Sequence, residues 1–137
     1  MANTKSIGVA FLDQDIVGAQ SILSDEQLGY TAAAQGTVTQ LTNKSTAVTL
    51  NKSAGIITMN NASLATATNA TFTLNNSLIS PNDTVILTIS GGQATPGSYN
   101  VFANALSAGS VSITLRNISG GSLSEAVVIN FAILHCV

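Results

Sequence analysis

The chain has 137 residues, enough for one compact domain but not for two domains with separate cores. Only 7% of the residues are charged, against roughly 25% in a typical soluble domain, and the formal net charge is −2. This balance excludes both the basic surface of a nucleic-acid-binding protein and the charge-rich composition of a disordered chain. Ser, Thr and Asn make up 45 of the 137 residues, so hydroxyl and amide groups must supply most of the polar surface.

Residues 1–35 differ in character from the rest of the chain. They carry half of the charged residues in about a quarter of the length, together with a short apolar run from Ile7 to Leu12. We interpret them as an N-terminal arm, or alternatively as an added strand of the same domain. The run is too short for a membrane helix, which needs about 20 residues, and no cleavage site typical of a signal peptide follows it. We therefore expect a soluble protein with no membrane partner.

From residue 36 to residue 137 the apolar residues recur at intervals of two between clusters of Gly, Asn, Ser and Pro. This period is typical of half-buried strands, and eight short strands predict an antiparallel β-sandwich, either jelly-roll or immunoglobulin-like. The turn-forming residues between the last four strands predict a meander. The predicted strands are Thr37–Leu41, Ala47–Leu50, Gly55–Met59, Ala70–Asn75, Thr84–Ser90, Tyr99–Ala105, Ser110–Asn117 and Ala126–Leu134.

The last predicted strand is apolar on both of its faces. One interpretation is a central strand buried inside the monomer. The other is that one face meets further copies of the chain, with a single Asn hydrogen-bonding across a symmetry axis. Low charge favours the second interpretation, because the cores of interfaces are depleted of charged residues. One face holds Val127, Ile129, Phe131 and Ile133, and the other, the candidate subunit interface, holds Val128, Asn130, Ala132 and Leu134.

Candidate catalytic and metal-binding groups are few. Asp13 and Asp15 would share one face of an extended segment, which is a start towards a glycosidase pair or a hard-metal site, but two carboxylates do not make a site. His135 and the lone Cys136 are adjacent, so on a strand they point to opposite faces. A glycan-cleaving site built on Asp13, Asp15 or Asp83 is a minor alternative. We expect no enzyme activity, no metal and no cofactor. A single cysteine also excludes an internal disulfide, which fits folding in a reducing cytoplasm.

Several pieces of the chain, in fixed order, resemble a module of tailed-bacteriophage virion proteins, and the likeness covers about 70% of the sequence. Residues 1–35 match nothing in that pattern. The pieces that carry the resemblance are Gly36–Gln40, Thr42–Lys52, Gly55–Asn60, Phe72–Asn76, Asp83–Ile86, Ala108–Ser110 and Asn117–Ala126.

The resemblance implies a head decoration, head-fibre or fibre-tip role, generally as a trimer. The short length and the lack of a stalk repeat favour a capsid decoration (cement) protein on the outer surface of a phage head. The expected partners are further copies of the chain and the major capsid protein, and the expected location is the virion, after synthesis in the host cytoplasm. The anchoring segments of such proteins vary with the capsid that they hold, so the resemblance does not extend to the attachment site. Our hypothesis is that the apolar residues of the first 35 form the capsid contact. The alternative is a head-fibre or tail-fibre tip module that exposes Ser, Thr and Asn to host-surface glycans. The candidate capsid-contact residues are Ile7, Val9, Phe11 and Leu12.

Overall fold

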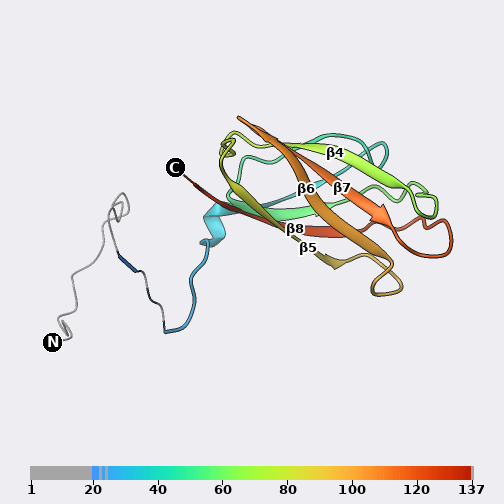
Figure 1. The fold of residues 1–137 in the computed structure, drawn as a ribbon, viewed down its shortest axis with the longest axis horizontal. Coiled ribbons are helices and arrows are strands. Elements are labelled where there is room, and N and C mark those ends of the chain that lie inside the picture. Colours follow the sequence, from blue (N-terminus) through green and yellow to red (C-terminus); the bar gives the residue numbers. More distant parts are fainter. Residues whose placement is uncertain (1–19, 22, 24, 137) are drawn as a thin grey trace.

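The computed structural model describes residues 20, 21, 23 and 25–136. Its strands form two four-stranded sheets packed face to face, so the predicted β-sandwich of eight strands is confirmed (Figure 1). Each predicted strand matches an observed one. A short 3-10 turn, η1 (Ala32–Ala34), precedes the strands, which are β1 (Gln35–Thr39), β2 (Val48–Thr49), β3 (Ala54–Thr58), β4 (Asn69–Asn75), β5 (Thr84–Gly91), β6 (Tyr99–Ser107), β7 (Ser110–Asn117) and β8 (Val128–Leu134).

The strand order shows how the chain moves between the sheets. One sheet, which we call sheet A, has the order β1-β3-β8-β5, and the other, sheet B, has the order β2-β4-β7-β6. Every connection therefore crosses from one sheet to the other except that of the β6–β7 hairpin. The predicted meander of the last four strands was wrong, because β5 pairs with β8 rather than with β6.

Four of the six strand pairings are antiparallel, as expected, but β1–β3 and β2–β4 are parallel. The cause is the alternation between sheets. A strand that leaves one sheet, crosses the sandwich and returns runs in its original direction, so β3 lies parallel beside β1. Both parallel pairs lie at sheet edges, where one of the two strands has a single neighbour.

The core lies between the sheets and follows the period-two pattern of the sequence. The inward-facing residues of β7 and β8 are almost fully buried, because these two strands are central in their sheets. All four residues assigned to the inner face of the last strand are in the core. The buried apolar residues include Ile57, Phe72, Leu74, Val111, Ile113, Leu115, Val127, Ile129, Phe131 and Ile133.

Two glycines at neighbouring positions of β1 and β3 explain how the edge of sheet A packs against the rest of the core. Gly36 and Gly55 are register partners. A Cβ on Gly36 would lie 2.9 Å from Leu50, and a Cβ on Gly55 would lie 2.7 Å from Leu50 and 2.9 Å from Phe131. The missing side chains therefore let Leu50 approach the sheet backbone closely.

The segment before β1 reaches the sandwich at the end where β8 finishes (Figure 1). There the Tyr30 hydroxyl donates a hydrogen bond to the Ile133 carbonyl oxygen, and Lys52 Nζ donates to the Ala33 carbonyl at 2.8 Å. The predicted capsid-contact residues, Ile7 to Leu12, lie outside the described residues, as do Asp13 and Asp15. In the part of the chain that the structure describes, no helix has the length and apolar character needed to cross a membrane.

Candidate functional site on the outer face of sheet A

The four residues predicted as a subunit interface lie together on the outer face of β8, the strand between β3 and β5. Asn130 and Leu134 are exposed, and Val128 and Ala132 are half-buried. The described part of the chain therefore leaves this face open to solvent. Of the two interpretations of the last strand, its central position in the sheet is confirmed, while none of the other described residues covers its outer face.

The register places further apolar side chains beside this strand. Ala132 lies between Ala54 on β3 and Ile86 on β5, and Asn130 lies between Ile56 and Thr88. Three of the large apolar residues of this face keep much of their surface in contact with water, namely Ile56 at 39%, Ile86 at 54% and Leu134 at 58%. Together they form an apolar patch across three adjacent strands.

No charged residue occurs in any of the four strands of sheet A. The edge strands of soluble proteins often carry Lys and other charged residues that prevent association, and the edge strands of sheet A, β1 and β5, carry none. Here Thr37, Thr39, Thr84, Thr88 and Ser90 supply the exposed polar groups of the face. A partner that covers this surface would therefore not have to desolvate a charge.

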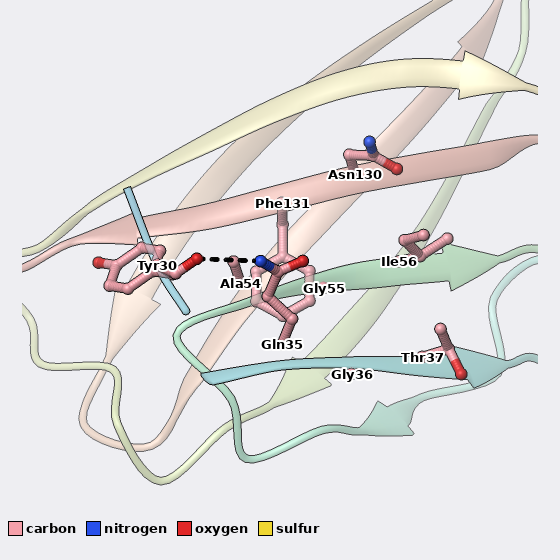
Figure 2. Close-up of a pocket in the computed structure, with 9 residues that line it drawn as sticks. All are labelled: Tyr30, Gln35, Gly36, Thr37, Ala54, Gly55, Ile56, Asn130 and Phe131. Carbon is pink, nitrogen blue, oxygen red and sulfur yellow. Dashed lines mark hydrogen bonds between the residues drawn. The ribbon is translucent and has the colours of Figure 1, made fainter. Parts of the chain in front are cut away.

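A shallow groove crosses the face over β1, β3 and β8 (Figure 2). Its volume is about 420 Å³. Tyr30 and Gln35 lie at one end, where the Gln35 side-chain amide donates a hydrogen bond of 3.1 Å to the Tyr30 carbonyl, and Ile56 and Asn130 lie towards the other end (Figure 2). Tyr30, held by its hydroxyl on Ile133, is a fixed wall of this groove.

A second hollow, of about 410 Å³, also includes Tyr30 in its wall but extends towards β5. It is mainly apolar, and its other large residues are Leu28, Ile86, Ile133 and Leu134. Leu28 and Tyr30 thus extend the apolar patch beyond the strands and onto the segment that leads to the N-terminus.

Asn130 is the polar residue at the middle of the patch. Its side-chain oxygen accepts a hydrogen bond of 2.8 Å from the Ser90 hydroxyl on β5. Among the described residues, nothing accepts from its amide NH₂ group, which therefore remains available to a partner. The geometry is compatible with the predicted hydrogen bond between copies.

A hydrogen-bonded carboxylate fixes the end of the patch near Leu134. Asp83, just before β5, accepts hydrogen bonds from the backbone N–H and hydroxyl of Ser80, both at 2.8 Å, and from the Cys136 N–H at 3.1 Å. Its carboxylate also lies 2.8 Å from His135 Nδ1. The Ser80 N–H is the largest cause that lowers the pKa of Asp83 from its ordinary 3.8 to about 2, with smaller contributions from Cys136 and His135. Asp83 is thus a structural residue that joins the start of β5 to the end of β8.

Two interior polar groups were not found by sequence reasoning. Lys44 is buried, and its Nζ donates to the carbonyl oxygens of Asn60, at 2.6 Å, and of Glu125. Burial lowers the pKa of Lys44, which the nearby Glu125 carboxylate partly offsets. Asn117 is fully buried and donates to the Leu64 and Gly121 carbonyls at 2.9 and 2.8 Å, while its side-chain oxygen accepts from the N–H and hydroxyl of Ser119. These groups connect loops through the interior and are not exposed as binding groups.

The described residues contain no group of three or more His, Cys, Asp or Glu side chains that could hold a metal ion. His135 is engaged by Asp83, and Cys136 is exposed and free. Comparisons of the chain with protein-family models, with curated proteins and with solved structures found no match. The fold and the site thus define a class, an eight-stranded mixed β-sandwich with one uncharged, partly apolar outer face.

Proposed function

We propose that the chain is a structural protein of a tailed-phage virion, a capsid decoration (cement) protein that acts by trimeric contact on the outside of the head. The observation that carries this proposal is the open outer face of sheet A, which combines exposed Ile56, Ile86 and Leu134 with a complete absence of charged residues in its strands.

The physical argument concerns the cost of leaving this face in water. Burying a Leu or Ile side chain stabilises a complex by about 1.5–3 kcal/mol. A standard protein interface covers about 800 Å² on each partner. Association through sheet A would remove the exposed apolar side chains from water and would give the Asn130 amide an acceptor.

Attachment to the head is assigned to a different part of the chain. The proposed contact with the major capsid protein is made by Ile7, Val9, Phe11 and Leu12. The described segment from Leu28 to Tyr30 leads from the sandwich towards them and is fixed to β8 by the Tyr30 hydroxyl. Such an arrangement would let three sandwiches associate while three N-terminal segments hold neighbouring capsid subunits. The protein would stabilise the capsid against internal pressure by burying surface where neighbouring capsid subunits meet.

Two measurements on the same protein test this proposal. Light scattering after size-exclusion chromatography should give three times the chain mass at micromolar concentration. Sedimentation with phage heads assembled without the chain should show saturable binding. A variant that lacks residues 1–20 should remain trimeric but stop binding heads. A strictly monomeric full-length chain, or a full-length chain that fails to bind heads, would overturn the proposal.

A further inference from the structure

The outer face of sheet B differs from that of sheet A in its chemistry, and its edge strand β6 holds an exposed aromatic ring. Asn100, Phe102 and Asn104 alternate along the outer face of β6, and the Phe102 side chain is 44% exposed. From these residues we infer that the sheet B face is a binding site for a neutral oligosaccharide, with Phe102 as the stacking platform. This inference goes beyond the proposed role in the capsid and uses the opposite side of the sandwich.

The side chains around Phe102 carry amide, hydroxyl and guanidinium groups. In the register of the sheet, Asn100 lies opposite Arg116, Phe102 opposite Thr114 and Asn104 opposite Ser112. The next strand, β4, continues these rows with Asn69, Thr71 and Thr73. An aromatic ring with hydrogen-bonding groups on both sides matches a sugar, which has an apolar C–H face and a rim of hydroxyl groups.

Part of this array is fixed by its own hydrogen bonds. The hydroxyls of Thr71 and Thr114 are 2.8 Å apart, and Thr114 donates to the Asn104 side-chain oxygen at 3.1 Å. Thr114 is only 2% exposed even though its side chain lies on the outer face. The Asn104 amide is therefore held in one orientation, in which its NH₂ group can donate to a ligand. Such pre-organisation reduces the entropy lost on binding.

Other polar groups of the face remain available. Within the described residues, the Asn100 side chain makes no hydrogen bond, and Arg116 gives one N–H to Asn69 at 3.3 Å and keeps its others. Residues two apart on a strand are about 6.8 Å apart. Asn100, Phe102 and Asn104 thus place an amide, a ring and an amide over about 14 Å, a span that fits a short oligosaccharide.

A bulge marks one end of this row. The pairing of β6 with β7 shifts register between Asn104 and Leu106, and Ala105 has a φ of 51°. This conformation is uncommon for a residue other than glycine, and bulges re-aim neighbouring side chains. It lies directly beside Asn104, one of the two amides assigned to the ligand.

The chemistry of the face favours a sugar over the other classes of partner. Arg116 is the one charged residue in the four strands of sheet B, too few for the phosphates of a nucleic acid. Among the residues of the four strands of sheet B, Phe102 is the one large apolar residue with high exposure, whereas the centre of a protein interface needs a cluster of such residues. A neutral oligosaccharide requires one ring and several amides and hydroxyls, which is what this face provides.

Isothermal titration of the full chain with maltohexaose, cellohexaose, mannohexaose and xylohexaose tests the inference. At least one of the four should bind, and Phe102→Ala should weaken that binding about tenfold, the effect of losing one stacked ring. Phe102→Tyr should retain it, and Asn100→Ala should weaken it less. Leu41→Ala is the matched control, because Leu41 is an exposed apolar residue in a turn outside both faces.

Four outcomes would overturn the inference. These are no binding of any of the four probes at millimolar concentration, equal binding by the Phe102→Ala and wild-type chains, loss of binding in Phe102→Tyr, or loss of binding in the Leu41→Ala control. Circular dichroism of each variant distinguishes a lost site from a lost fold. The capsid proposal is tested independently by mass and by head binding, which Phe102→Ala should leave unchanged.

Discussion

The two outer faces of this sandwich have the same strand geometry but opposite surface chemistry. Sheet A exposes Ile56, Ile86 and Leu134 around one Asn, while sheet B exposes one Phe among rows of Thr, Ser and Asn. Both faces are nearly without charge. The difference shows that low charge alone does not make a face apolar, because hydroxyl and amide groups keep one face polar while the other remains partly apolar.

The largest expected effect on stability comes from removing buried hydrogen bonds of the sandwich interior, which supports both outer faces. Asn117→Ala removes four hydrogen bonds, while the Leu64 and Gly121 carbonyls each keep one other donor, the Leu123 N–H and the Ser119 hydroxyl. We expect the free energy of unfolding to fall by about 3 kcal/mol. Urea denaturation measures this loss, with Asn61→Ala, at an exposed position in the adjacent loop, as the control that should change little.

Charge placed on the outer face of sheet A should show which of the two outer faces mediates association. The double substitution Ile86→Lys with Leu134→Lys puts two ammonium groups on the apolar patch without touching the core. If copies associate through this face, the dissociation constant should rise by at least about 100-fold. Analytical ultracentrifugation measures the change, and the same substitution at Phe102 should leave the association state unchanged. Equal association of the wild-type and double-variant chains would place the interface elsewhere.

A smaller effect is expected on sheet B. Thr114→Val keeps the shape of the side chain but removes the hydroxyl that joins Thr71 to Asn104. The unfolding free energy should fall by about 1 kcal/mol, and any sugar binding should weaken because the Asn104 amide is no longer held. An unchanged melting temperature would show that this hydrogen-bond chain contributes nothing to the sheet. The association state should not respond.

Low pH should weaken the contacts of the Asp83 carboxylate, which joins the start of β5 to the end of β8 in sheet A. The pKa of Asp83 is about 2 in the folded chain and 3.8 ordinarily, so the unfolded chain binds a proton first as the pH falls. The stabilisation is nearly complete above about pH 5 and should be lost progressively as the pH falls from about 5 towards 2. Asp83→Asn should be less stable at neutral pH and should lose this part of the pH dependence. Thermal denaturation from pH 2 to 6 measures both, and identical slopes for the two chains would contradict the assignment.

The sequence was sufficient to predict the eight strands and the two faces of β8, because alternation of apolar and polar residues is a local signal. It did not predict the two parallel pairs or the order of the sheets, because these depend on connections that cross the sandwich. The polar interior was also missed. Lys44 and Asn117 bond to backbone carbonyls far along the chain, and in a sequence so rich in Asn nothing local distinguishes a buried Asn from a turn residue. The turn after Asn117, with Ser119 and two glycines, was the one available hint.

The exposed ring on β6 could have been recognised from the strand alone. Predicting Tyr99–Ala105 as a strand already places Phe102 on the same side as Asn100 and Asn104, and an aromatic residue between two amides on a wet face is unusual. The sequence could not predict which residues of β7 and β4 lie beside Phe102, because the register between strands cannot be read from the sequence of a single strand.

The position of β8 has a consequence for how the protein is made. It is the last of the eight strands in chain order, yet it lies between β3 and β5 in sheet A. Until β8 is inserted, no backbone hydrogen bonds connect β5 to the other strands of the sheet. Folding must then wait until residues 128–134 have emerged from the ribosome, and with so many non-local pairings it should take milliseconds to seconds rather than microseconds. During that interval the earlier strands of sheet A, which carry no charged residue, are vulnerable to aggregation.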